Sequence, residues 1–337
     1  TDALESGADE HVVVVRAEDD PLDTTLPRGK QDWQVEPHAI WYHRTTGIWR
    51  TVCLEAVPRL HVRSLAWTAD VPNASVRLEL ELSRRPTAPT TLDVALEHDG
   101  QELANVRLAV TDQTVTLDVP LDGQRNGQHH EQLLWSPHRP RLVDAHVSVV
   151  TPDSTDAVGS YLGIRSVGVE HGRFLLNDRP LYLRSVLEQG YWPGSHFTPP
   201  SHEAMRAEVE LVRELGFNAM RIHQKVEDPR FLFWCDKLGV LVWGETAGAY
   251  RFDDRAVQRL TTEWVEIVRQ YRSHPSIVTW VPFNESWGIQ HGAHDPAQRA
   301  YAIGLTNLTR ALDPTRPVIS NDGWEHTDSD VWTVHDY

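Results

Sequence analysis

Apolar and polar positions alternate over much of the first 170 residues, and this is the period of a β-strand with one buried face. Residues 11–19 (HVVVVRAED) and 47–57 (GIWRTVCLEAV) are each predicted to form a strand, with a loop rich in turn formers between them. Roughly three strands cannot enclose a core of their own. We therefore expect residues 1–60 to be the C-terminal part of a β-sandwich whose beginning precedes this chain.

The alternation continues over residues 61–170, where short strands are separated by turn signals. The pairs Asp99-Gly100 and Asp122-Gly123 are two of these signals. The alternating segments are 59–71, 75–84, 90–100, 102–110 and 113–121. About six or seven short strands over roughly 100 residues are typical of an immunoglobulin-like sandwich. The paired cysteines of antibody domains are absent.

After residue 170 the pattern changes to strands that alternate with helices. A hairpin and strand over 172–186 come first, and Ser201 and Gly216 are suitable caps for the first helix. The predicted helices are 201–216, 229–239, 253–275 and 295–313, and the predicted strands are 218–223, 240–245, 276–285, 317–322 and 330–337. This alternation indicates parallel βαβ units with about six strands.

Such units close either as an open doubly wound sheet or as a barrel of about eight strands. The segment RSVLEQGYWPGS after the first strand lacks the glycine spacing of a dinucleotide site, which argues against the open sheet and against a dehydrogenase. We expect residues 171–337 to be the N-terminal part of a TIM barrel. The predicted fold class is therefore a multidomain chain: a β-sandwich remnant, an immunoglobulin-like sandwich and an incomplete barrel.

Polar and aromatic residues stand at the carboxyl ends of the predicted barrel strands, where TIM-barrel enzymes place their reactive groups. The apolar run 277–283 ends in Asn284 and Glu285. A carboxylate at the end of a buried strand must be hydrogen-bonded, solvated or functional. The rim positions of the other strands are Glu188, Gln189, Tyr191, Trp192, Arg221, His223, Glu245, Asn321, Asp322, Trp324, His335, Asp336 and Tyr337.

The composition narrows the class of partner. The net charge of -16 argues against nucleic acid and anionic membranes, and 13 Trp suit both a core and sugar binding. Cys53 and Cys235 match no metal or redox spacing, so the fold requires no oxidising compartment and the cytoplasm is favoured. No apolar stretch is long enough to span a membrane, and no signal peptide is seen at the N-terminus, where the chain lacks a starting Met.

The motif HPSIVTWVPFNESWG resembles the acid/base signature of glycoside hydrolase family 2, the family of β-galactosidases, β-glucuronidases and β-mannosidases. The segments TTGIWRTVCLE and LWSPHRPRL resemble parts of that family's sugar-binding jelly-roll and immunoglobulin-like domains. The segments FLLNDRPLYLRSVLEQGYWP, LGFNAMRIHQK and WCDKLGVLVWGE resemble its first three barrel strands. The similarity covers nearly the whole chain in the family's domain order.

The resemblance implies a retaining glycosidase that cleaves terminal β-linked sugars, β-galactosidase-like, with two carboxylates ~5 Å apart. Glu285 falls on the acid/base position, and its apolar, Trp-rich surroundings are expected to raise its pKa. Asn284 falls on the position that hydrogen-bonds the sugar 2-hydroxyl. Arg221 and His223 match a supporting pair, and Tyr337 a tyrosine near the nucleophile. The nucleophilic Glu of strand seven has no counterpart here, so we expect this chain alone to be inactive.

Several alternatives stay open from the residues alone. Arg221 could form a salt bridge to Glu245, and Trp324 is a candidate for a sugar subsite. The segment HGAH, residues 291–294, is better explained as a glycine-containing loop than as a metal site, so no metal and no cofactor are expected. The second candidate function is a non-catalytic carbohydrate-binding protein on the same scaffold. The sugar, the linkage and assembly into a homo-oligomer are left open.

Overall fold

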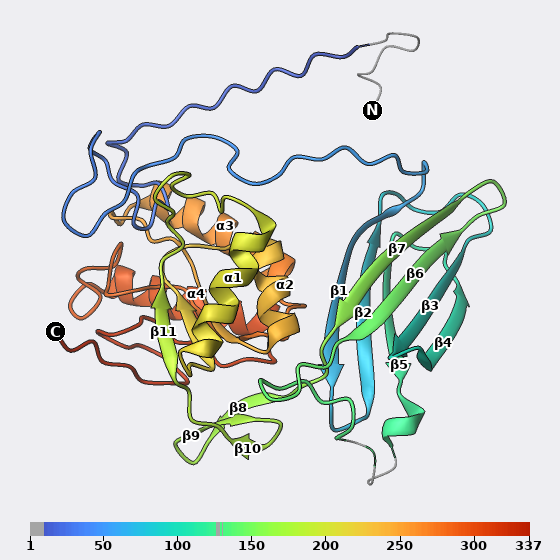
Figure 1. The fold of residues 1–337 in the computed structure, drawn as a ribbon. Coiled ribbons are helices and arrows are strands. Elements are labelled where there is room, and N and C mark those ends of the chain that lie inside the picture. Colours follow the sequence, from blue (N-terminus) through green and yellow to red (C-terminus); the bar gives the residue numbers. More distant parts are fainter. Residues whose placement is uncertain (1–9, 126–128, 130) are drawn as a thin grey trace.

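The computed structural model describes residues 10–125, 129 and 131–337. An extended N-terminal segment leads into two antiparallel sheets, and a parallel sheet flanked by helices follows them (Figure 1). A short three-stranded sheet, order β10-β9-β8, connects the antiparallel part to the parallel part. It consists of β8 (Val167–Glu170), β9 (Arg173–Leu176) and β10 (Arg179–Pro180).

Seven strands form the antiparallel part, as the sequence pattern predicts. They are β1 (Val62–Asp70), β2 (Ser75–Leu82), β3 (Thr91–His98), β4 (Gln101–Ala109), β5 (Thr114–Pro120), β6 (Val143–Val150) and β7 (Thr155–Leu162). The sheet orders are β1-β2-β5 and β4-β3-β6-β7. Every second residue of β2, β3 and β6 is buried, and these side chains fill one apolar core shared by both sheets. The alternation in the sequence is thus the alternation between core and solvent.

The turn between β3 and β4 has the conformation that its sequence favours. Asp99 and Gly100 have φ of 51° and 74°. Positive φ at both central residues is the requirement of the tight hairpin turn, and Asp-Gly is one of the pairs that meet it. A single-turn 3-10 helix, η1 (Asp122–Gln124), follows β5 at the second expected turn.

The strands expected at 11–19 and 47–57 are not formed, and this part of the prediction is wrong for the described residues 10–60. Within residues 10–60 the only β-bridge joins Gln31 and Tyr42, and neither residue belongs to the two expected strands. Val12 and Val14 are 87% and 85% exposed. A strand is stable only beside another strand that accepts its backbone hydrogen bonds, and these two segments have no such neighbour. The assignment of residues 1–60 to a jelly-roll sandwich stays a prediction.

The parallel sheet has the order β11-β12-β13-β14 and is built as the βα alternation predicts. Its strands are β11 (Ser185–Glu188), β12 (Ala219–Ile222), β13 (Leu241–Glu245) and β14 (Ile277–Val281). The helices are α1 (His202–Glu214), α2 (Pro229–Leu238), α3 (Asp254–Tyr271) and α4 (Pro296–Leu312). Ser201 caps α1 by accepting from the N–H of Ala204, as expected, and Pro229 opens α2. All five residues of β14 are buried.

The fifth and sixth expected strands need a correction. Residues 317–322 run parallel to β14 and the turn after it, but they pair there only at two bridges, Trp280 in β14 with Val318 and Asn284 in the turn with Asp322. Residues 330–337 form no strand in the described chain, and Trp332 is 75% exposed. Each of these segments therefore lacks the continuous ladder of backbone hydrogen bonds that defines a strand. About six parallel strands were expected, and the described residues form four.

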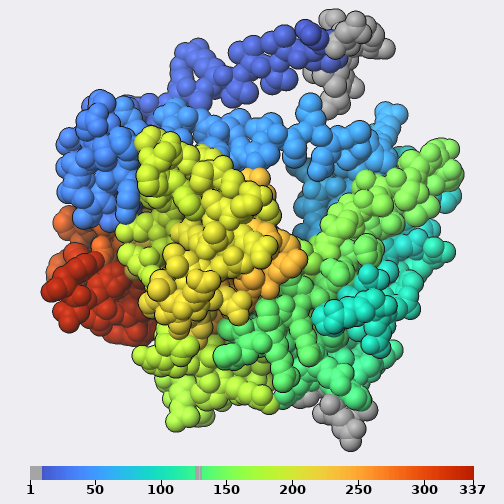
Figure 2. All heavy atoms as spheres, viewed as in Figure 1, coloured from blue at the N-terminus to red at the C-terminus, as the bar shows by residue number. Residues whose placement is uncertain are grey.

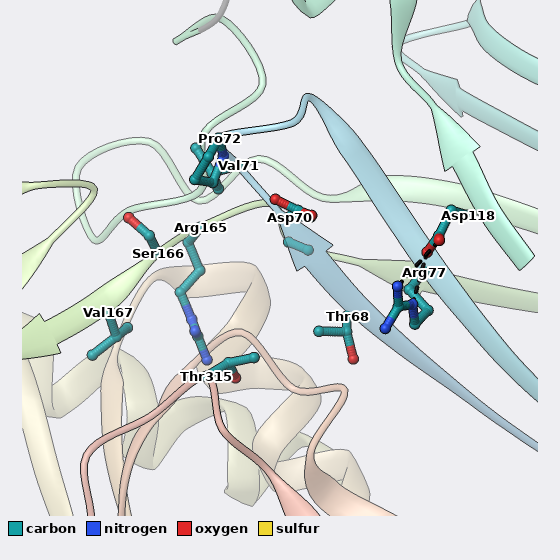
Figure 3. Close-up of a pocket in the computed structure, with 11 residues that line it drawn as sticks. Thr68, Asp70, Val71, Pro72, Arg77, Asp118, Arg165, Ser166, Val167 and Thr315 are labelled. Carbon is teal, nitrogen blue, oxygen red and sulfur yellow. Dashed lines mark hydrogen bonds and ion pairs between the residues drawn. The ribbon is translucent and has the colours of Figure 1, made fainter. Parts of the chain in front are cut away.

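The antiparallel and parallel parts meet in an interface that contains a cavity of about 300 Å³ (Figure 3). Its lining includes Asp70 and Arg77 from the sheets, Arg165 from the connection and Thr315 from the loop after α4. Arg77 is paired with Asp118, and Arg165 points toward Thr315. No rim residue contributes to this cavity, so it is a feature of the interface and not of the candidate site.

Candidate functional site

The candidate site lies at the carboxyl end of β14, where the buried strand leads into a strained turn. Glu285 and Ser286 have φ of 48° and 59°. Two successive non-glycine residues in the left-handed region are costly, and such strain collects at functional sites. The N–H of Glu285 donates to the carbonyl of Asp322 (2.9 Å), and the N–H of Asp322 donates to the carbonyl of Phe283 (2.8 Å). These bonds hold the strained turn against residues 317–322.

The carboxylate of Glu285 accepts two hydrogen bonds, and both fall on the same oxygen. Nδ1 of His335 donates to Oε1 at 2.6 Å, and the hydroxyl of Tyr337 donates to Oε1 as well. Among the described residues nothing hydrogen-bonds Oε2, and the side chain is 13% exposed. One carboxylate oxygen is thus fixed, and the other can meet a ligand.

The pKa of Glu285 departs from expectation. Burial raises it, but the hydrogen bonds from Tyr337 and His335 and the nearby charges of His335 and Lys30 outweigh burial, so the pKa lies below its ordinary value of 4.5. The expected rise is therefore wrong for the protein without a ligand. The apolar strand buries the carboxyl as predicted, but its end places donors against it.

Arg221, at the end of β12, is the centre of the polar network behind Glu285. Its guanidinium lies 2.8 Å from both Glu245 and Asp322. Nη2 donates to Oδ1 of Asn284 at 2.5 Å, and Nη1 lies 3.2 Å from Nε2 of His335. His335 donates to Glu285 through Nδ1, and its Nε2 also lies 3.3 Å from Oδ2 of Asp322. The salt bridge to Glu245 that the sequence left open is present.

Arg221 and the carboxylates around it stabilise each other's ionised forms although they are buried. Burial lowers the pKa of Arg221, but Glu245 and Asp322 outweigh it and the pKa is raised. Burial raises the pKa of Glu245, but Arg221 and His223 outweigh it and the pKa is lowered. Arg221 and Glu245 are therefore both held in their charged forms.

Asn284 has one amide atom in use and one free. Its Oδ1 accepts from Arg221, while its buried Nδ2 has no hydrogen-bond partner in the part of the chain that is described. A buried N–H without an acceptor is unfavourable by about 1–3 kcal/mol. Such a donor marks the place where a ligand oxygen would fit.

The remaining predicted site residues differ in how closely they join this cluster. His223 is buried, and its Nδ1 lies 3.2 Å from Oε1 of Glu245, outside good hydrogen-bond alignment. Tyr337 reaches Glu285 although the residue is 97% exposed. Trp324 is about half exposed and makes no ring contact with any described aromatic residue. The structure brings Glu285, Asn284, Arg221 and Tyr337 together.

Known proteins identify this fold. The family described as "Glycosyl hydrolases family 2, TIM barrel domain" matches residues 167–337, just over half of the chain. The chain belongs to glycosyl hydrolase family 2. A relative from Formosa agariphila named "Putative beta-glucuronidase" is 25% identical over 329 residues, which cover 94% of this chain and 37% of that protein.

Solved structures agree on the fold of this family 2 chain. The β-D-glucuronidase of Dictyoglomus thermophilum has a TM-score of 0.63 at 20% identity, covering 77% of this chain and 44% of its own. The family 2 β-galacturonidase of Eisenbergiella tayi has a TM-score of 0.64 at 20% identity, covering 79% and 46%. At these identities the likeness shows a common fold. The chain spans less than half the length of these relatives.

Three residues join the candidate site without having been assigned a role from the sequence. Asp322 and His335 stand at the ends of predicted strands, so the rim position was a signal for both. Lys30 interacts electrostatically with Glu285 and Glu245 from the N-terminal segment. No pattern in the sequence places that segment at the barrel rim.

Two kinds of feature are absent from the described residues. No cluster of three or more His, Cys, Asp or Glu side chains there is arranged to hold a metal ion. The HGAH segment forms turns before α4, with the N–H of His294 donating to the carbonyl of His291. Among the described helices none has the length and apolar character to cross a membrane.

Proposed function

We propose that this chain is the acid/base half of a retaining glycosidase that cleaves terminal β-linked sugars. The observation that supports the proposal is that two adjacent residues at one strand end each have a polar atom without a hydrogen-bond partner among the described residues. Glu285 has an Oε2 that no described residue hydrogen-bonds, and the adjacent Asn284 has a buried Nδ2 that is likewise free. In a retaining mechanism the first would exchange a proton with the glycosidic oxygen, and the second would donate to a sugar hydroxyl beside it.

The lowered pKa of Glu285 fits the second half of such a reaction. An ionised carboxylate is the base that activates water to release the sugar, and the donors Tyr337 and His335 favour that form. The first half requires the protonated form. We propose that a bound sugar excludes water from the rim, weakens these hydrogen bonds and so raises the pKa of Glu285.

The second carboxylate is not assigned to a rim residue of this chain. Glu245 and Asp322 are both bound by Arg221, and a nucleophile must be free to approach the anomeric carbon. We expect the nucleophile from a part of the protein that these 337 residues do not include. Activity is therefore proposed for the protein that contains the complete barrel.

The substrate class is proposed in the same coarse terms. A β-galactosidase-like specificity is one candidate, and the relatives named for glucuronides and galacturonides make acidic sugars a second. Residues 61–170 are proposed as the immunoglobulin-like unit, because they form two antiparallel sheets around a core of their own. Residues 171–337 are proposed as the barrel domain.

A variant of Glu285 tests the proposal in the protein with a complete barrel. Glu285→Gln removes the proton donor while keeping the shape of the side chain. We expect kcat/KM to fall at least about 100-fold for alkyl or disaccharide β-glycosides and much less for dinitrophenyl β-glycosides, whose leaving group needs no proton.

The control for this test is Glu210→Gln on α1, where the carboxylate pairs with Arg206 away from the rim. This variant should hydrolyse both substrate types at the wild-type rate. Equal losses for good and poor leaving groups in Glu285→Gln would contradict the acid/base role. Sugar binding without turnover in the complete protein would favour the second candidate, a carbohydrate-binding protein.

A further inference from the structure

The N-terminal segment lies directly against the rim of the parallel sheet. The N–H groups of Arg28 and Gly29 both donate to the carbonyl of Gly248 at 3.1 Å, and Tyr250 donates its hydroxyl to the carbonyl of Gly29. A Cβ at position 29, where φ is +58°, would lie 2.2 Å from the carbonyl oxygen of Gln224. Only glycine permits this approach, so residue 30 is delivered to the ends of β12 and β13.

Lys30 is then fixed from its other side. Its carbonyl accepts from the N–H of Tyr42 at 2.8 Å, and the carbonyl of Tyr42 accepts from the N–H of Asp32 at 2.8 Å. The ring of Tyr42 stacks on Tyr191 with centroids 4.1 Å apart. Figure 2 shows the N-terminal segment (blue) packed on the same part of the molecule as the C-terminal residues (red). Lys30 is consequently 7% exposed although it belongs to a segment without regular structure.

The ammonium group of Lys30 has no partner of its own. No hydrogen bond or ion pair joins this ammonium to any residue that the structure describes. Lys225 is the contrast: this residue is 1% exposed, and its ammonium donates to the carbonyls of Gly190 and Phe197 and pairs with Glu227. The side chain as a whole is buried, but its Nζ atom is not cut off from solvent, so water or a ligand oxygen can accept its hydrogen bonds. Burial lowers the pKa of Lys30, and the charges of Glu285 and Glu245 raise it.

We propose that Lys30 is a substrate-contacting residue whose ammonium donates hydrogen bonds to an oxygen of the sugar bound at Glu285. The proposal rests on the proposed function, because it assumes that a sugar occupies this rim. A sugar ring offers the acceptors that the ammonium lacks, either hydroxyl oxygens or a carboxylate. The N-terminal segment thereby becomes part of the binding site, and not only a support for the barrel.

The sequence makes this contact unusually easy to observe. The chain holds only three lysines, Lys30, Lys225 and Lys237. The probe protein is the one with the complete barrel, labelled with ¹⁵N- and ¹³C-lysine, and the side-chain NMR signals of these three residues are assigned by single Lys→Arg variants. The probes are phenyl β-thioglycosides of glucuronic acid, galacturonic acid, galactose, glucose and mannose, which are not hydrolysed.

We expect at least one thioglycoside to shift the Lys30 signal while the signal of Lys237, on the surface of α2, stays in place. Lys30→Met should lower the affinity for that thioglycoside at least about 10-fold, and Lys30→Arg should retain part of the affinity. Lys237→Met is the matched control and should bind as the wild type does. If Lys30→Met weakens the binding of the two uronic acid thioglycosides alone, Lys30 contacts the sugar carboxylate. If it weakens the binding of neutral sugars, Lys30 contacts a hydroxyl.

Two results would overturn the proposal, and they differ. In the first, a thioglycoside binds and Asn284→Ala abolishes its binding, but Lys30→Met binds it normally and the Lys30 signal of the wild-type protein does not shift. The Lys30 contact is then wrong, and the proposed function stands. If none of the five thioglycosides binds at millimolar concentration, the sugar site itself is wrong, and the role of Lys30 falls with it.

Discussion

At the scale of single residues, the chemistry of the rim depends on which donors face each carboxylate. Glu285 and Glu245 end two neighbouring apolar strands, yet their oxygens differ. Glu245 is bound by Arg221 and lies beside His223, whereas Glu285 keeps Oε2 clear of every described donor. Burial alone would raise both pKa values, and in both cases nearby donors and charges reverse that effect. The free oxygen, and not the pKa, distinguishes the proposed acid/base residue.

Glu208, on α1, is the opposite case, since burial and the charge of Glu227 raise its pKa to about 7 against the attraction of Lys225. Above pH 4.5, the ordinary pKa of a glutamate, the unfolded chain releases this proton while the folded protein still holds it. The free energy of unfolding therefore falls as pH rises from about 4.5 to 7. We expect Glu208→Gln to raise it at pH 8 by up to about 3 kcal/mol, and by little at pH 4.

Urea unfolding at the two pH values checks this prediction. Glu210→Gln on the same helix is the control, because Glu210 is partly exposed and its ion pair with Arg206 contributes little. A gain in stability that is the same at pH 4 and pH 8 would mean that folding does not raise the pKa of Glu208.

At the scale of elements, the segment around Gly29 has no regular structure and is held by backbone hydrogen bonds to Gly248 and by the hydroxyl of Tyr250. We expect Gly29→Ala to lower the midpoint of thermal unfolding and to detach Lys30 from the rim, because the new Cβ would overlap the carbonyl oxygen of Gln224. Gly304→Ala is the matched substitution, since a Cβ added to this exposed glycine in α4 would meet no atom outside its own helix within 4 Å. It should stabilise the protein by roughly 0.5–1 kcal/mol.

Differential scanning fluorimetry compares the two glycine variants directly. Lys30 NMR then reports whether the segment has moved. If Gly29→Ala unfolds at the wild-type temperature with an unchanged Lys30 signal, the N-terminal segment does not contact the barrel as described.

At the scale of the whole molecule, Asp236 on α2 joins the antiparallel part to the barrel. Its carboxylate accepts from the hydroxyl of Tyr161 on β7 (2.9 Å) and from the N–H of Ser276 (2.9 Å), and it pairs with His274 (2.6 Å). The indole of Trp135 donates to its carbonyl at 2.8 Å. One fully buried residue thus serves both parts, which couples their unfolding.

We expect Asp236→Ala to lower the free energy of unfolding by about 3 kcal/mol, because several buried donors lose their acceptor at once. Tyr161→Phe removes one hydrogen bond and should cost about 1 kcal/mol. Urea unfolding followed by Trp fluorescence measures both. Asp118→Asn, in the exposed pair with Arg77, is the control and should change the stability by less than about 1 kcal/mol. Equal effects of the Asp236 and Tyr161 variants would argue against a shared anchor.

The sequence by itself determined the elements whose residues carry their own signal. The alternating pattern of β1–β5, the Ser201 cap of α1 and the buried run of β14 follow from period, turn chemistry and capping, which act over a few neighbouring residues. The rim positions of Glu285, Asn284 and Arg221 follow from where the strands end. The family 2 signature added their proposed roles.

Only the tertiary structure decided what depends on distant segments. Residues 11–19 and 47–57 have strand-like sequences but no strand beside them, and residues 330–337 end as an irregular segment whose His335 and Tyr337 reach Glu285. The pKa of Glu285 is set by those two donors from about 50 residues away in sequence, and Lys30 arrives from the other end of the chain. Hydrogen bonds and charges act between groups that are close in space, so no local sequence pattern could predict these contacts.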